Sequence, residues 1–443
     1  MIRYHAKYIL PITAPPIADG VVAVNDGRIV YVGSHRSGPS GDDIELGDVL
    51  LLPGLINAHC HLELTAMRGF LEGLDFRTWI LRLTAAKRAV LSRDMLLDAA
   101  RYGIVEGLRH GITTYADTCD SGVAFDAMRE SGVRGVMYQE VFGPDPAQCA
   151  TSLAELREKV ERLRPLETPL VRVGVSPHAP YTVSDSLFAA VATYARLESL
   201  PVAIHIAESQ LELDLVSAGA GAFADGLLAR GIGVAPRART PIDLLSKLDV
   251  LSARPLLIHC VRVDADDIDR IVSARCTVAH CPASNAKLGH GIAPLCALVN
   301  SGVSVGIGSD SMASNNRMDL LEEARVATLL QRANHGDFRE LTAAEVLTLA
   351  TLGGARALSL EQEVGSLEAG KAADLAAFPL EGVAPVFDPV TAAVFALPGA
   401  RASFVTVAGK VLVRDSVIVN SDLSLETRVQ ATADALQQWL RNT

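Results

Sequence analysis

Eight short apolar segments alternate with longer amphipathic stretches through the middle of the chain. Most segments open with Gly or Pro or follow one closely, and they end at or near polar residues. They cover residues 55–61, 111–117, 133–142, 171–178, 201–208, 255–261, 276–282 and 303–310. Near-continuous apolar runs are typical of strands buried on both faces, and the stretches between them have the spacing of helices. Eight such β/α units predict a (β/α)8 barrel of the TIM type in an α/β protein.

The two chain ends have a different pattern. Residues 1–52 alternate short β-rich runs with turns, and the Asp26-Gly27 pair between two runs is a strong hairpin signal. A similar texture returns at residues 373–378 and 403–411. We therefore expect a small, antiparallel β-sandwich domain built from residues 1–53 and 356–420, with the barrel over 54–355. A C-terminal helix over 421–443 carries Leu425, Val429, Leu436 and Leu440 at helical spacing.

Composition narrows the class of protein. A chain of 443 residues suits a barrel of about 250 residues with a smaller domain. The net charge of −11, with no stripe of Lys and Arg, argues against a nucleic-acid partner. No apolar run approaches about 18 residues, so no membrane span is expected. The seven scattered cysteines contain no C-x-x-C pair, which indicates reduced thiols in a cytoplasmic protein. We expect a small-molecule partner.

Imidazoles gather at the ends of the predicted strands. His59 and His61 are two positions apart and so point to one face of a strand. Six of the eleven histidines lie within two residues of a strand end: His59, His61, His178, His205, His259 and His280. Polar residues are common where strands meet solvent, but that alone gives no preference for histidine. Because the carboxyl ends of barrel strands form the active face, the clustering predicts a metal site.

Ordered motifs then give a specific resemblance. They read PGLINAHCH, SPHAPYT, HIAES, LIHCVRVD, CPASNAKLGHGIAP, GIGSDSMASNN and VGSLEAGKAADL, between residues 53 and 375. With these motifs the chain resembles the amidohydrolase superfamily, in its branch of cytosine-deaminase-like and adenosine-type aminohydrolases. The zinc deaminases with a short H-x-E and P-C-x-x-C pattern have a different fold, and neither signature occurs here.

The resemblance implies a metal-dependent hydrolytic site. It assigns His59, His61, His205 and Asp310 as ligands of one divalent ion, with Zn2+ expected and Fe2+ or Mn2+ as alternatives. Such an ion lowers the pKa of a water molecule toward about 7, so that hydroxide can attack the ring carbon at neutral pH.

The same resemblance assigns catalytic roles to three residues. Glu208 would carry a proton from water to the substrate ring, Asp310 would orient the water, and His259 would polarise it or stabilise the adduct. His178 would contact the ring. Relatives that displace chloride from triazines can lack an acid at the position of Glu208, so its presence favours deamination.

Other residues are weaker candidates for substrate binding. Trp79 lies where relatives cover a purine with an aromatic ring, although it could equally pack a loop. Glu63 could orient His61, contact a ribose hydroxyl or cap the next segment. Gln139 and Glu140 end the third strand and are expected to face the same mouth, with Gln139 as the candidate for substrate binding. Arg68 and Arg77, in the long loop after the first strand, could meet an acidic tail or remain solvated.

The loop after the seventh strand adds four polar residues. We expect no ligation from His280 or His290. Ser284 and Asn285 are expected to shape their loop rather than take part in chemistry.

Only the resemblance limits the set of candidate substrates. The H-L-E sequence, the YQEVFGPD run and residues 212–245 are similar to aminodeoxyfutalosine deaminases of the futalosine route to menaquinone. The main alternative is deamination of S-adenosylhomocysteine, methylthioadenosine or adenosine. A guanine-, pterin- or triazine-type ring is a further one. A non-enzymatic scaffold is disfavoured because no predicted ligand is missing. Relatives are commonly oligomers, so a homo-oligomer is possible.

Overall fold

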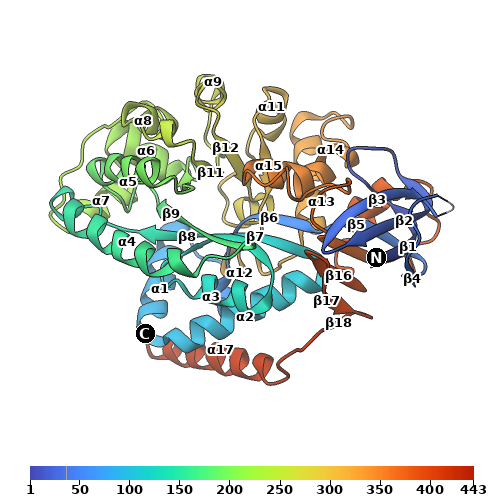
Figure 1. Ribbon diagram of the computed structural model, residues 1–443. Coiled ribbons are helices and arrows are strands. Elements are labelled where there is room, and N and C mark those ends of the chain that lie inside the picture. Colours follow the sequence, from blue (N-terminus) through green and yellow to red (C-terminus); the bar gives the residue numbers. More distant parts are fainter. Residues whose placement is uncertain (36) are drawn as a thin grey trace.

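The central part of the chain forms the predicted (β/α)8 barrel (Figure 1). The computed structural model describes residues 1–35 and 37–443. The barrel strands are β6 (Leu55–His61), β7 (Ile112–Cys119), β8 (Arg134–Val141), β9 (Val171–Pro177), β10 (Ala203–Ile206), β11 (Leu256–His259), β12 (Thr277–His280), β13 (Val305–Ile307) and β14 (Asp310–Ser311). All their pairings are parallel, and Asp310 pairs with Cys60 to close the ring. A single bridge from Val175 to Val202 joins β9 to β10.

The eighth strand is interrupted, which the apolar pattern did not predict. It consists of β13 and β14, with Gly308 between them. A Cβ atom at Gly308 would lie 2.9 Å from the backbone nitrogen of His59, so only glycine allows this approach. Asp310 follows with φ of 57°, in the left-handed region that non-glycine residues seldom occupy. The break therefore turns Asp310 toward the end of the first strand.

Helices cover the outside of the barrel and fill its loops. They are α1 (Phe76–Val90), α2 (Arg93–Arg109), α3 (Val123–Ser131), α4 (Cys149–Leu163), α5 (Asp185–Glu198), α6 (Gln210–Ala218), α7 (Ala222–Leu228), α8 (Pro241–Lys247), α9 (Ala265–Ala274), α10 (Pro282–Lys287), α11 (Leu295–Asn300), α12 (Met312–Asn315), α13 (Leu320–His335), α14 (Ala343–Thr348), α15 (Gly354–Ala357) and α16 (Pro389–Phe395). Short 3-10 turns are η1 (Leu62–Met67), η2 (Pro146–Gln148), η3 (Arg164–Leu166) and η4 (Leu251–Ala253), and η5 (Leu349–Gly353) is a π-helix.

Helix α1 corrects one prediction from the sequence. The segment after the first strand was expected to be a long loop, but Arg77 and Trp79 lie on a fifteen-residue helix. Asp75 caps this helix by accepting a hydrogen bond from the backbone N–H of Thr78. Phe76, Trp79 and Leu83 are its buried face. The helix therefore presents aromatic side chains where an irregular loop was expected.

Both chain ends form the small β domain, as predicted. Its strands are β1 (Ile2–Ile9), β2 (Ile17–Asn25), β3 (Arg28–Ser34), β4 (Asp42–Glu45), β5 (Val49–Pro53), β15 (Leu375–Pro379), β16 (Phe404–Val407), β17 (Lys410–Arg414) and β18 (Val417–Ile418). They make one nine-stranded sheet. The Asp26-Gly27 hairpin is present between β2 and β3, with φ of 49° and 75°.

The sheet of the small domain differs from the expected antiparallel arrangement. Strand β1 pairs in parallel with both β4 and β5, because the chain crosses over between them. The rings of Tyr4 on β1 and Phe404 on β16 are 5.1 Å apart although two strands separate β1 from β16 in the sheet order. The sheet therefore folds back on itself, in the manner of a sandwich, around a shared apolar core.

The C-terminal helix α17 (Leu425–Asn442) lies along α2 at the bottom of Figure 1. Leu425 and Val429 pack against Ala66 and Ala99, and Arg428 donates to Asp98 at 2.7 Å. This apolar face agrees with the helical spacing in the sequence. No helix among residues 1–35 and 37–443 is long and apolar enough to cross a membrane.

A buried ion pair joins the barrel to the small domain. Arg134, at the start of β8, donates to both carboxylate oxygens of Asp374 at 3.0 and 3.2 Å. The second of these oxygens also accepts from the backbone N–H of Ala408 at 2.7 Å. The two charged side chains are only 6% and 2% exposed, so neither can be solvated by water if its partner is lost.

We predict that Asp374→Ala lowers the free energy of unfolding by about 3–5 kcal/mol, because it leaves the Arg134 guanidinium buried and unpaired. Urea denaturation of the variant and the parent measures the difference. The paired replacement of Arg134 by Met and Asp374 by Leu should cost less than the single change. A loss below about 1 kcal/mol, as for an exposed pair, would contradict this account.

Candidate metal and catalytic site

Three imidazoles and one carboxylate converge at the carboxyl ends of the strands. His59 Nε2 lies 3.2 Å and His61 Nε2 lies 3.5 Å from Asp310 Oδ1, and His205 Nε2 lies 3.3 Å from His61 Nε2. Ligands about 2.0–2.1 Å from a tetrahedral zinc ion lie about 3.3 Å from one another. The spacing and the donor set both fit one divalent ion. The structure thus brings together the four residues predicted as ligands.

The histidines are held in the form that binds metal. His61 Nδ1 lies 3.0 Å from the backbone carbonyl of Thr118, and His205 Nδ1 lies 3.3 Å from that of His178. A proton on Nδ1 leaves the Nε2 lone pair free for a metal. Burial lowers the pKa of His61 to about 3 and holds the pKa of His205 well below its ordinary value. Neutral imidazoles are therefore expected at neutral pH.

Two serines fix the second oxygen of Asp310. Ser284 Oγ donates to Asp310 Oδ2 at 2.5 Å, and Ser314 Oγ donates to it at 3.1 Å. Burial opposes the charge of this carboxylate, but the adjacent His59 and His259 outweigh that effect and hold its pKa well below the usual range. Ser284 was expected to shape its loop rather than take part in chemistry, and its hydroxyl in addition holds the carboxylate of Asp310.

Glu208 lies beside the metal-ligand cluster, between two further histidines. Its Oε1 atom is 3.6 Å from His259 Nε2 and 3.3 Å from His290 Nε2. Burial raises the pKa of Glu208. The nearby His259 and His290 lower the pKa by more than burial raises it, so that it lies below the ordinary value. The carboxylate is only 4% exposed. A buried, ionised carboxylate here can accept a proton and return it.

Other residues hold this group in place. Asn285 Oδ1 lies 2.9 Å from His259 Nδ1 and so fixes the orientation of the imidazole, a positioning contact beyond the loop-shaping role expected of Asn285. The carboxylate of Glu212 accepts from the backbone N–H groups of Ala207 and Glu208. His259 has φ of 77° and Ala207 has φ of 52°. Such left-handed backbone is strained, and it is common where side chains are aimed at a site.

His178 borders the cluster on its other side. Its ring lies 4.8 Å from that of His205, and its Nδ1 atom lies 2.7 Å from Thr182 Oγ1, which leaves Nε2 available. Burial lowers the pKa of His178 to about 4. The rings of Phe142 and Tyr181 lie 4.9 and 5.7 Å from it. His178 is therefore a neutral group in an aromatic setting.

An aromatic layer from α1 and α7 packs beside the site. Phe76 lies edge-on to His290 at 4.4 Å, and Trp79 stacks on Phe76 at 6.3 Å. Phe223 of α7 contacts Phe76 and stacks on Tyr181 at 4.2 Å. Phe76 thus contacts a site histidine, whereas Trp79, which the sequence singled out, lies behind it.

Glu63 is bound by groups other than His61. Its carboxylate pairs with Lys87 of α1 and accepts from Ser121 Oγ, and Cys119 Sγ lies 3.2 Å away. It is the carbonyl of Thr118, and not Glu63, that lies against His61. Burial opposes its charge, but Lys87 and these hydrogen bonds lower its pKa. Glu63 is an ionised, buried carboxylate at the end of the first strand.

The remaining residues predicted to bind substrate have different partners in the structure. Gln139 donates its amide to the backbone carbonyls of Cys119, Asp120 and Glu140. Arg68 pairs with Glu106 of α2 and is exposed. Arg77 lies against Gly226 of α7 and has no carboxylate partner among residues 1–35 and 37–443. Of this group only Arg77 retains an unpaired charge.

Sequence reasoning assigned no role to Ser314, did not place His290 against Glu208 and did not distinguish Glu140 from Gln139. His290 was placed near the seventh strand but not against Glu208, and Ser314 lies within the GIGSDSMASNN motif without a mark of its own. Glu140 follows Gln139, and burial raises the pKa of its carboxyl well above the ordinary value. The alternation of side chains along a strand was the one signal that could have shown that Glu140 and Gln139 face opposite sides.

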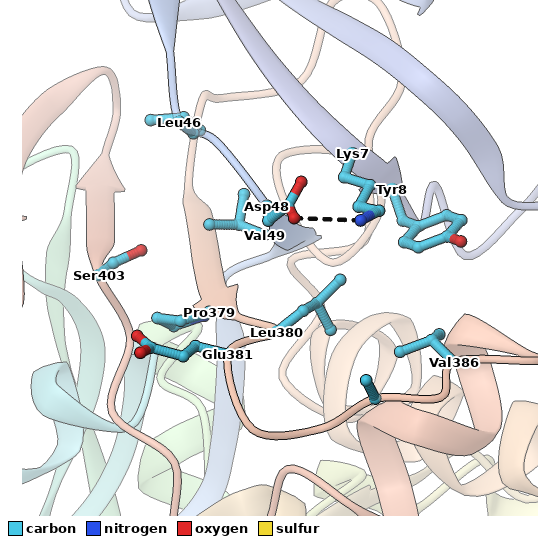
Figure 2. A pocket seen from close by; sticks show the side chains of 11 residues that line it. Lys7, Tyr8, Leu46, Asp48, Val49, Pro379, Leu380, Glu381, Val386 and Ser403 are labelled. Atoms are coloured by element: carbon cyan, nitrogen blue, oxygen red, sulfur yellow. Dashed lines mark hydrogen bonds and ion pairs between the residues drawn. The ribbon is translucent and has the colours of Figure 1, made fainter.

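A separate cavity of about 590 Å³ is lined by residues of the small domain and of the segment after β15 (Figure 2). Lys7, Asp48, Pro379, Glu381 and Ser403 are among its lining residues, and Lys7 pairs with Asp48 at 3.1 Å. It contains none of the clustered histidines. The chemistry of the barrel mouth, and not this cavity, therefore identifies the candidate site.

Comparison with known proteins agrees with this geometry. The Amidohydrolase family model matches residues 50–412. A 5-methylthioadenosine/S-adenosylhomocysteine deaminase of Moorella thermoacetica is 33% identical over 411 residues, covering 91% of this chain and 92% of that protein. An adenosine deaminase from Xanthomonas campestris, solved with bound zinc, has a TM-score of 0.88 and 29% identity, with 100% and 99% of the two chains covered.

A more distant solved structure shares the fold. Aminofutalosine deaminase of Helicobacter pylori, in complex with methylthio-coformycin, has a TM-score of 0.83 at 23% identity, covering 93% of this chain and 100% of that one. The family match extends over most of the chain and includes all four clustered metal-ligand candidates. The chain belongs to the amidohydrolase family, and it is a hydrolytic deaminase.

Proposed function

We propose that this protein is a metal-dependent deaminase of an adenine nucleoside, which replaces the exocyclic amine by oxygen and releases ammonia. One observation carries the proposal: the buried carboxylate of Glu208 lies beside a four-residue metal-ligand cluster and against two imidazoles. Deamination requires a group that first accepts and then donates a proton close to the attacking water. Glu208 satisfies that requirement without serving as a ligand.

The four ligands would hold one divalent ion, for which Zn2+ is the proposed metal and Fe2+ or Mn2+ the alternatives. When bound, such an ion would lower the pKa of water to about 7 and so supply hydroxide at neutral pH. Asp310 contributes Oδ1 toward the ligands, while Ser284 and Ser314 hold Oδ2, so its orientation is fixed before substrate arrives.

Proton transfer is assigned to the residues beside the ligands. Glu208 takes a proton from water and delivers it to a ring nitrogen of the purine, which makes the adjacent ring carbon electrophilic. His259, held through Nδ1 by Asn285, presents Nε2 to the attacking oxygen. His178 presents its free Nε2 to the purine. Delivery to the ring nitrogen returns Glu208 to its ionised form. Glu208 then takes the proton of the hydroxyl group added to the ring carbon and gives it to the leaving amine, so that a carbon–oxygen double bond forms as ammonia departs.

For the 5′ substituent we propose the carboxyphenyl tail of aminodeoxyfutalosine, which would place the enzyme in the futalosine route to menaquinone. The sequence resemblance at H-L-E and YQEVFGPD supports this substrate. So does Arg77, an unpaired cation on α1, one residue from Phe76 of the aromatic layer. Arg68 is less suited because Glu106 neutralises it. Methylthioadenosine or S-adenosylhomocysteine is the second candidate, favoured by the 33% identity to the Moorella protein.

Arg77→Met tests the assignment of the tail. We expect KM for aminodeoxyfutalosine to rise about 10-fold or more, because a charged hydrogen bond contributes roughly 1.5–3 kcal/mol. KM for methylthioadenosine, which lacks a carboxylate, should change little. Arg68→Met is the matched control and should leave both values near those of the parent. An equal rise for both substrates would contradict the assignment.

The proposed reaction class is tested with the zinc-loaded protein. Ammonia release should accompany the loss of adenine absorbance when an adenine nucleoside is supplied. Guanine, pterin and triazine substrates are the competing class. Faster ammonia release from any of these, with no turnover of adenine nucleosides, would overturn the proposal while leaving metal dependence intact.

A further inference from the structure

Glu140 places a buried carboxyl group inside the barrel. Along β8, Val136 and Tyr138 face the barrel interior with Ile56 and Ile258, so the two-residue alternation directs Glu140 inward as well. The residue is 5% exposed. Its Oε1 atom has no hydrogen-bond partner among the residues that the structure describes. Native proteins rarely retain such a group without a reason.

Ser176 provides a second observation at the same place. It pairs with Glu140 across β8 and β9, it is fully buried, and its hydroxyl also has no partner within the described chain. The adjacent Gln139 faces the other way and has three backbone acceptors. Gln139, which faces outward, therefore has hydrogen-bond partners, whereas Glu140 Oε1 and the Ser176 hydroxyl have none within the described chain.

Glu140 lies at the edge of the metal-ligand cluster. One of its carboxylate oxygens and ring nitrogens of His178 and His205 all lie within 4.8 Å of one another. His178 is the residue assigned to contact the purine. A ligand that reaches His178 would therefore come within reach of Glu140.

Titratable groups divide the mouth of the barrel into two halves. Glu208, His259 and Asp310, on or beside β10, β11 and β14, are the groups assigned to proton transfer. On the other half, Glu63, Asp120 and Glu140 lie in or after β6, β7 and β8, with Lys87 paired to Glu63. In the proposed reaction the reacting carbon of the purine lies beside Glu208 and Asp310, and we expect the sugar to extend toward this second half. Carboxyl groups of Asp and Glu are well suited to bind ribose hydroxyls.

We propose that Glu140 is a specificity-determining residue that binds a hydroxyl group of the sugar. The inference rests on the proposed deamination of an adenine nucleoside. Oε1 of Glu140 has no partner among the described residues, and the substrate hydroxyl would supply its hydrogen bond. Replacement of such a residue should impair substrate use without weakening the fold, since no internal contact is lost.

Glu140→Met tests the proposal in the zinc-loaded protein with adenosine, 2′-deoxyadenosine and 3′-deoxyadenosine. We expect kcat/KM for adenosine to fall about 10- to 100-fold, with a much smaller fall for the deoxynucleoside that lacks the bound hydroxyl. Glu140→Gln, which keeps a hydrogen-bonding group, should recover part of the loss. The midpoint of thermal unfolding should stay the same or rise. Glu155→Gln, an exposed change on α4, is the control.

Three outcomes would overturn the inference. Equal losses for all three nucleosides would show that Glu140 does not contact a sugar hydroxyl. A large fall in the unfolding midpoint of both variants would show a structural role. A second equivalent of zinc bound by the parent and absent from Glu140→Met would assign the group to a cation. If the parent deaminates no adenine nucleoside at all, the proposed function fails first, and that result is separate from these three.

Discussion

Replacement of Glu208 by Gln should lower kcat for deamination about 100- to 10,000-fold, the range that a positioned acid–base group contributes. The amide preserves the shape of the side chain but can neither accept a proton from water nor deliver one to the ring. Bound metal should remain at the level of the parent, because the four ligand candidates are other residues. Ammonia release and metal analysis of the same preparation measure the two quantities.

The Glu208 prediction has a matched control and a clear contrary result. Glu155→Gln makes the same chemical change on the exposed face of α4 and should behave like the parent. Loss of metal from Glu208→Gln would mean that this carboxylate supports the ligand cluster instead of moving protons. Retention of full activity with metal bound would remove Glu208 from the mechanism.

Removal of the metal should abolish deamination and also weaken the fold. The clustered imidazoles and Asp310 are buried, and only the folded protein brings them together. Binding to the folded state alone stabilises it by about 4 kcal/mol at a metal concentration 1,000 times the Kd. Chelated protein should therefore unfold at a lower temperature, and one equivalent of Zn2+ should restore both the unfolding midpoint and the activity.

Asp310→Asn sharpens the metal test. The amide lacks the negative charge that balances a divalent cation, so the variant should need far more Zn2+ for the same thermal shift. Ser311→Ala, at the neighbouring position on β14, is a control that leaves the carboxylate in place. An undiminished shift in Asp310→Asn would place the metal elsewhere.

The barrel could be predicted because its strands are buried on both faces. Such strands read as continuous apolar runs, and their polar ends mark one face of the barrel. His59 and His61 could be paired from their spacing alone, whereas His205 and Asp310 required the resemblance. What links these residues in space is the closed ring, in which Asp310 pairs beside Cys60.

The rest of the site depends on contacts between distant loops. The hydrogen bonds from Ser284 to Asp310 and from His259 to Asn285 each span 26 residues, and no local pattern encodes them. Helix α1 was missed because its polar positions resemble those of a loop. Gln139 and Glu140 were both expected to face the mouth, although they are adjacent on a strand, and only the register of β8 decides which of the two faces the interior.

The central claim is that the protein deaminates an adenine nucleoside with a carboxylated 5′ tail. The most direct test is to measure kcat/KM for ammonia release from aminodeoxyfutalosine and to compare it with the values for methylthioadenosine, S-adenosylhomocysteine and adenosine. The zinc-loaded protein should give its highest value with aminodeoxyfutalosine. Much faster turnover of the other three nucleosides would contradict the assignment of the tail, and no ammonia from any of the four would contradict the deaminase itself.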